Sequence, residues 1–131
     1  MARNIAAAEP EYGTDAVAPA VVHPLDMQHL ARQTLGDAGL QDEVLRLFDE
    51  LQRTYFDRLE SSTTRNDLMV NLHALKGAAA GVGAFALSEL ARAAEDELRT
   101  GAPVNPERVD DIGMAVEETS AYIATLIDDD Y

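Results

Sequence analysis

The chain has 131 residues with 10 Lys and Arg, 24 Asp and Glu and a formal net charge of -14 at pH 7, so its length suits one domain. Hydrophobic residues make up 47% of the chain, which supplies an aliphatic core and excludes wholesale disorder. The acidic excess excludes broad binding to nucleic acid or anionic lipid, since both require clustered Lys and Arg, and the absence of Cys excludes disulfides and thiolate sites.

Residues 1–22 are predicted to form a flexible arm. They are rich in Ala, Pro and Val and show no sustained period. Glu9 and Glu11 interrupt the start of the chain before a signal-peptide core could form, and no run of about 18 apolar residues could cross a bilayer. We therefore expect a cytoplasmic protein with one domain over residues 23–131, and the opening Met favours a complete small chain.

From Pro24 onward the apolar residues recur at helical spacing, which predicts an all-α fold. A short helix is expected over residues 25–35, with Pro24 in its initial turn and Gly36 at its end. A second helix is expected over residues 40–59. Its predicted buried stripe consists of Val44, Leu47, Phe48, Leu51, Tyr55 and Leu59.

Two further helices are expected over residues 65–82 and 84–99. Thr64 or Asn66 is the candidate N-cap of the first, and Gly101 and Pro103 follow the end of the second. The predicted core stripe of the first is Leu68, Leu72, Leu75, Ala79 and Val82. That of the second is Leu87, Leu90, Ala91, Ala94 and Leu98.

A last helix is expected to begin at Asn105-Pro106, a cap residue followed by proline. Fraying is predicted at Asp128 to Asp130, because acidic residues are unfavourable at the negative end of a helix dipole. Four long helices with short connections predict an antiparallel up-down-up-down four-helix bundle with a short additional N-terminal helix. The predicted core side of this last helix is Val109, Ile112, Val116, Ile123 and Leu126.

The third predicted helix differs from the rest in charge. Residues 61–83 contain one more basic than acidic side chain, whereas residues 101–131 contain seven more acidic than basic ones. The third helix also holds the only lysine, Lys76, on the same helical face as His73. A second stripe, at an angle to the core stripe, is expected to face solvent. It consists of Met69, His73, Lys76, Gly77 and Ala80.

Glycines inside and just after this helix require a reason, because an internal Gly costs about 1 kcal/mol relative to Ala. Gly77 lies one turn beyond His73 and is expected to leave open space above the imidazole. Gly81 and Gly83 are expected to serve helix packing or the helix end.

The segment His73-Ala74-Leu75-Lys76-Gly77, followed by Gly83, Leu87 and Glu95, resembles the histidine-containing phosphotransfer (HPt) family of bacterial phosphorelays. The resemblance implies a helical bundle whose exposed histidine accepts a phosphoryl group from an aspartyl phosphate on a receiver domain and passes it to another receiver. His73 would be the phosphoacceptor, through the ring nitrogen remote from the backbone.

The resemblance also implies roles for the other matching residues. Glu95 would accept a hydrogen bond from the second ring nitrogen of His73, Lys76 would approach the phosphoryl group, and Gly77 would admit the phosphate and the receiver. Met69, Ala80 and parts of the first two helices would form the docking surface. The partners would be receiver domains and a sensor or hybrid histidine kinase; the chain would be a monomer without a cofactor, and Mg²⁺ would be held by the receiver.

Other interpretations remain open at this stage. The chain could be a non-catalytic adaptor of the same ancestry, or an unrelated helical adaptor, which predicts a buried His73. Taken singly, His73 and Lys76 would be read as ordinary surface residues, and Glu95 as part of a solvated acidic run. His23 and His29 are six residues apart, which does not suit a metal site, and both are expected to be surface residues. No phosphate-cradling glycine loop is present, so we expect no kinase activity with ATP.

Overall fold

The computed structural model describes residues 23–127, and all regular secondary structure in this range is helical. The predicted arm over residues 1–22 and the predicted fraying at Asp128 to Asp130 lie outside the described residues. In chain order the helices are α1 (Met27–Gln33), α2 (Ala38–Ser61), α3 (Arg65–Val82), α4 (Phe85–Arg99) and α5 (Pro106–Leu126).

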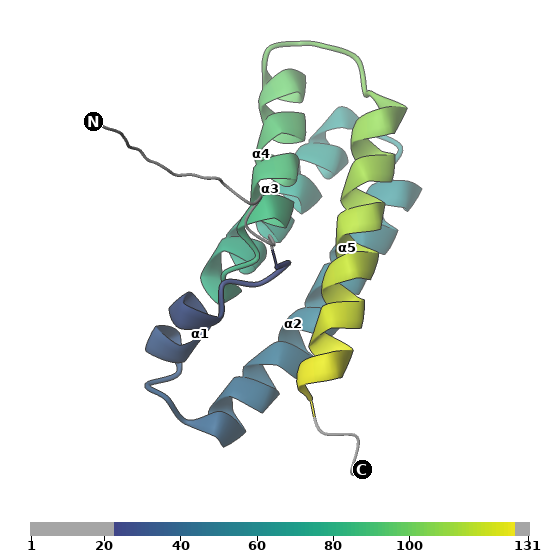
Figure 1. Ribbon diagram of the computed structural model, residues 1–131. Helices are drawn as coiled ribbons and strands as arrows, with labels where there is room; N and C mark the ends of the chain where they lie inside the picture. Colours follow the sequence, from purple (N-terminus) through teal and green to yellow (C-terminus); the bar gives the residue numbers. More distant parts are fainter. Residues whose placement is uncertain (1–22, 128–131) are drawn as a thin grey trace, which may run out of the picture.

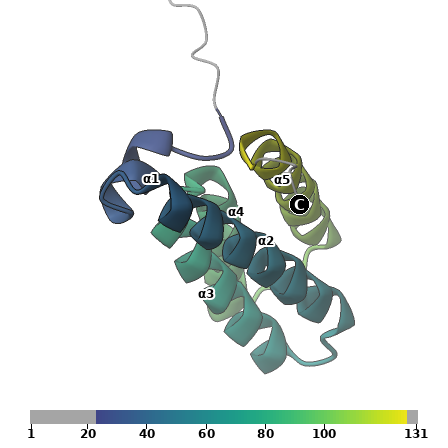
Figure 2. The ribbon, with the colours of Figure 1, turned by 90° about the horizontal axis from the view of Figure 1, so that it is seen from below.

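The four long helices form an antiparallel bundle, with consecutive helices running in opposite directions (Figure 1). Helix α2 packs against α3 and α5, and α4 packs against the same two neighbours, so the four helices surround one core. The short α1 lies at one end of the bundle, outside the long helices (Figure 2). The predicted all-α fold, with an additional N-terminal helix, is confirmed.

Side-chain caps explain where four of these helices begin. Each cap side chain accepts a hydrogen bond from a backbone N–H two or three residues later. These caps are Asp26, Asp37, Thr64 and Asn105. Because Asp37 caps α2, that helix starts earlier than predicted. Helix α1 is shorter than predicted, since it starts after Asp26 and the chain turns into the left-handed region at Leu35 and Gly36.

The predicted core stripe of α3 is buried at every position, and the helix has the predicted bounds. The stripes of α4 and α5 are also buried, apart from Leu90, Val109 and Leu126, which are half-buried. Glu95 on α4 and Thr119 on α5 are buried among these apolar side chains. The core of the bundle is therefore not purely apolar, because it contains a carboxyl group and a hydroxyl group.

The predicted stripe of α2 is wrong in part. Leu47 is 57% exposed, and Val44, Leu51 and Tyr55 are only half-buried. The core face is rotated because α2 packs between α3 and α5, and the residues that it buries are Leu45, Phe48, Gln52 and Leu59. Gln52 was missed because a polar side chain adds nothing to an apolar pattern; its amide donates a hydrogen bond to Asp49.

Helix α1 is attached to the C-terminal end of α3. The Asp26 N–H donates to the Gly83 carbonyl over 2.9 Å, and Leu25 and Leu30 are buried. His23 is exposed, as predicted. His29 is instead half-buried: its Nε2 lies 3.1 Å from the carbonyl oxygen of Gly81, and its ring meets Phe85 edge-on. His29 therefore has a structural role that its sequence position did not reveal.

Candidate functional site

His73 lies in the middle of α3, and its side chain is 68% exposed. The core stripe of α3 faces the interior of the bundle, and His73 lies on the solvent-exposed side of the same helix. The second predicted stripe is exposed at His73 and Gly77 and half-buried at its other positions. This geometry contradicts the burial of His73 in the free chain that an unrelated helical adaptor predicted.

Glu95 projects from α4 toward His73, and its side chain is only 3% exposed. The Glu95 Oε2 atom lies 3.1 Å from His73 Nδ1. An ionised carboxylate can only accept a hydrogen bond, so Nδ1 carries the proton. The other ring nitrogen, Nε2, then keeps its lone pair and can act as a nucleophile.

Lys76 joins the same carboxylate from the next turn of α3. Its Nζ lies 3.0 Å from Glu95 Oε1, and its side chain is 27% exposed. Burial raises the pKa of Glu95, but the ion pair with Lys76 and the hydrogen bond with His73 outweigh it, so the pKa lies below its ordinary value of 4.5. Glu95 is therefore ionised at neutral pH.

Gly77 lies one helical turn after His73 and borders open space. A Cβ atom built on Gly77 would meet no other atom within 4 Å. The surface at Gly77 is therefore open, as it is at Gly81. By contrast, Gly83 ends α3 in the left-handed conformation, with φ of 89°, which agrees with its predicted place at the helix end.

Arg99 is a further member of this cluster that sequence reasoning missed. Its guanidinium donates to Glu95 Oε2 over 2.7 Å, so this oxygen contacts both Arg99 and His73. The signal was present in the sequence, because Glu95 and Arg99 are four residues apart on one helix, a spacing at which opposite charges pair. Ser88 supports the arrangement by donating to the Lys76 carbonyl, which ties α4 to α3.

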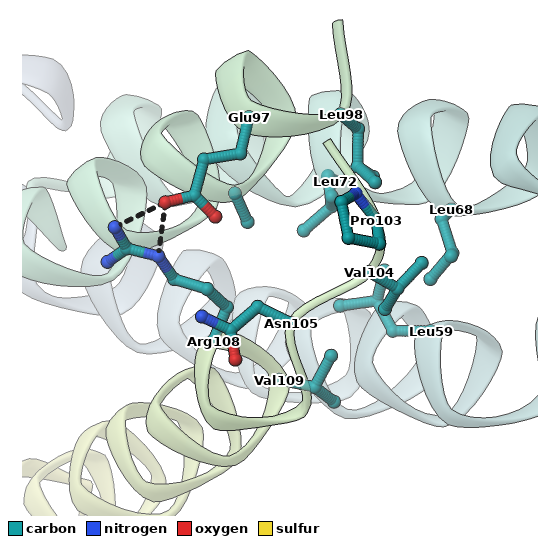
Figure 3. A pocket seen from close by; sticks show the side chains of 11 residues that line it. Leu59, Leu68, Leu72, Glu97, Leu98, Pro103, Val104, Asn105, Arg108 and Val109 are labelled. Atoms are coloured by element: carbon teal, nitrogen blue, oxygen red, sulfur yellow. Dashed lines mark hydrogen bonds and ion pairs between the residues drawn. The ribbon is translucent and has the colours of Figure 1, made fainter. Parts of the chain in front are cut away.

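Other surfaces offer less chemistry. A small pocket at the α4–α5 connection is lined by apolar side chains, Asn105 and an ion pair in which Arg108 donates twice to Glu97 (Figure 3). Within residues 23–127, no three His, Asp or Glu side chains gather as they would for a metal ion. No helix in that range combines the length and apolar character that crossing a membrane requires.

Comparisons with known proteins agree with this geometry. The Hpt domain family matches residues 40–122, a segment that contains His73, Lys76, Gly77, Glu95 and Arg99. The crystal structure of histidine phosphotransferase ShpA from Caulobacter crescentus superposes with a TM-score of 0.60 at 28% sequence identity, covering 78% of this chain and 88% of that chain. The comparison with curated proteins gives no match.

Proposed function

Because the chain belongs to the Hpt domain family, and hence acts as a phosphorelay carrier, we propose that it accepts a phosphoryl group on His73 from the aspartyl phosphate of a receiver domain and passes it to a second receiver. The observation that carries this proposal is an exposed imidazole whose Nδ1 is held by the buried carboxylate of Glu95.

The transfer uses the free lone pair of His73. Nε2 attacks phosphorus, the bond from phosphorus to the aspartyl oxygen breaks, and its electron pair remains on the receiver carboxylate. The ring carries a positive charge while its Nδ1 proton is retained, and the negative charge of Glu95, 3.1 Å away, stabilises that charge. The same steps in reverse deliver the phosphoryl group to the second receiver.

Positioning and charge neutralisation supply most of the catalysis in such a transfer. A bound phosphoryl group adds a charge of roughly -1.5 to -2, and Lys76 is the cation on the same helical face as His73. The gap at Gly77 leaves room for the phosphate and for the receiver loop that presents it. In this proposal the receiver holds the Mg²⁺, and the chain has no cofactor of its own.

Exposed apolar side chains on α2 and α3 suit a transient docking surface. Val70, one turn before His73, is 58% exposed, and Leu47 and Leu40 on α2 are 57% and 41% exposed. Together with the half-buried Met69 and Ala80, they provide apolar contacts for a receiver. We place the chain in the cytoplasm as a monomer, with a sensor or hybrid histidine kinase as the ultimate phosphate source.

The direct test is transfer from a purified receiver carrying a radiolabelled aspartyl phosphate. We expect label to leave the receiver and appear on this chain within the lifetime of the acyl phosphate, and then to move to a second receiver added later. A panel of receivers identifies the partners. A chain that binds receivers throughout the panel but never gains label would be a non-catalytic adaptor.

Substitutions at Gly77 should affect stability and transfer in opposite directions. Gly77→Ala adds a methyl group to open space in a helix interior, so the free energy of unfolding in urea should rise by about 1 kcal/mol. Gly77→Leu should retain a stable fold but slow transfer by about tenfold, equivalent to about 1.4 kcal/mol in the barrier, because its side chain enters the space beside His73. The matched stability control is Gly81→Ala, which also adds Cβ to open space. Undiminished transfer by Gly77→Leu would show that this gap is not used.

A further inference from the structure

One buried carboxylate in this bundle has two cationic partners. Lys76 Nζ lies 3.0 Å from Glu95 Oε1, and an Arg99 guanidinium nitrogen lies 2.7 Å from Oε2. Orienting the His73 ring requires only a hydrogen-bond acceptor, which Oε2 provides. The second cation therefore needs a different explanation.

We infer that Arg99 is a positioning residue that keeps Glu95 neutralised when Lys76 moves from Glu95 to the phosphoryl group arriving at His73. The inference rests on the proposed function, because it assigns Arg99 a part in the same transfer. Arg99 does not touch the phosphate in this account; it acts through Glu95.

The need for such a residue follows from the burial of Glu95. A buried carboxylate is strongly destabilising once its only counterion leaves. Lys76 is the only lysine of the chain. Its single positive charge cannot neutralise both Glu95 and an incoming phosphoryl group at the same time. Until Nε2 bonds to phosphorus and the ring gains its positive charge, Lys76 would otherwise be the only cation at Glu95, whose charge would hold Lys76 in place and would also repel the incoming phosphate.

Arg99 is suited to this task by its chemistry and its attachment. Its planar guanidinium can make several directed hydrogen bonds to a carboxylate. One nitrogen donates to Glu95 Oε2, and another lies 3.3 Å from Asp96 Oδ1. Arg99 shares Oε2 with His73, whereas Lys76 contacts Oε1, so Lys76 can leave without disturbing the contact that orients the ring.

The chain supplies a matched control on the same helix. Arg92 is 48% exposed, compared with 56% for Arg99, and pairs with Glu89 and Asp96 without contacting Glu95. Arg92→Gln therefore removes the same charge and a similar set of surface ion pairs. It leaves the Glu95 cluster intact.

The transfer test uses phosphoramidate as a small phosphodonor, so that receiver docking does not contribute. The donor reacts in the form whose nitrogen is protonated: His73 Nε2 bonds to phosphorus, the bond from phosphorus to that NH3⁺ group breaks, and ammonia leaves with the electron pair. We expect Arg99→Gln to slow phosphorylation of His73 by about tenfold, Arg92→Gln to change it less than twofold, which is about 0.4 kcal/mol, and Arg99→Lys to restore most of the rate. Equal rates for wild type and Arg99→Gln would overturn the inference.

A double variant separates action through Glu95 from any other effect of Arg99. In a Glu95→Gln background the side chain at position 95 keeps a hydrogen-bond acceptor for Nδ1 but carries no charge. Adding Arg99→Gln to that background should then have no further effect on the rate. If Arg99→Gln reduced the phosphorylation rate as much in this background as in the wild-type background, Arg99 would not act through the charge of Glu95.

A third measurement is independent of phosphotransfer. The Glu95 carboxyl signal, followed by NMR against pH in the unphosphorylated chain, should titrate at higher pH in Arg99→Gln than in wild type, and it should not move in Arg92→Gln. If the titration midpoint of Glu95 were the same in Arg99→Gln as in wild type, the inferred neutralisation of Glu95 by Arg99 would be contradicted. Failure of the wild-type chain to become phosphorylated would instead contradict the proposed function, so the two outcomes are distinguishable.

Discussion

A chain carrying His73→Gln should gain no label from a phosphorylated receiver that labels the wild-type chain fully. The substitution removes the only nucleophilic nitrogen of the cluster, because the Gln amide nitrogen has no available lone pair. The side chain is 68% exposed, and a Gln amide can still donate to Glu95, so the variant should fold with a thermal midpoint close to that of wild type. Radiolabel on the chain after separation from the receiver is the measurement.

The remaining histidines provide the controls for this experiment. His23→Gln changes an exposed ring that stacks on Tyr122, and His29→Gln changes the ring that contacts Gly81 and Phe85. Both variants should be labelled like the wild-type chain, and the label should be lost in acid and retained in alkali, as expected for phosphohistidine. Label that persisted in His73→Gln would move the acceptor to another residue.

The largest stability effect is expected at Gly83, where α3 ends and the start of α1 is attached. Gly83 has φ of 89°, and a Cβ atom there would lie 2.9 Å from the Asp26 carbonyl oxygen and 3.3 Å from the His29 ring. Gly83→Ala therefore combines left-handed strain of about 1–2 kcal/mol with an overpacking cost of about 1–3 kcal/mol. We expect the free energy of unfolding in urea to fall by the sum of these two effects.

Gly101 separates the two contributions. It also has a positive φ, 93°, but a Cβ atom there would meet no atom within 4 Å. Gly101→Ala should therefore cost only the left-handed strain of about 1–2 kcal/mol. Equal losses of stability in Gly83→Ala and Gly101→Ala would show that the close approach of Asp26 to Gly83 adds no overpacking cost.

Local signals in the amino-acid sequence specify much of this protein. Helix α3 has the predicted bounds because Thr64 caps its start and Gly83 ends it, and both effects act over a few residues. His73, Lys76 and Gly77 could be placed on one face for the same reason, because a single helix determines their relative positions. Gly77 borders open space, as that placement predicted.

The packing of α2 and the surroundings of Glu95 depended on the tertiary structure. Leu47 belongs to an apolar stripe by spacing, yet it is exposed, because the two neighbours of α2 determine which face is covered. Glu95 lies in an acidic run that would suit a solvated face, yet it is buried against His73, Lys76 and Arg99. A single helix specifies relative positions around its own axis, whereas the burial of each face and the partners of each charge depend on helices that are distant in the sequence.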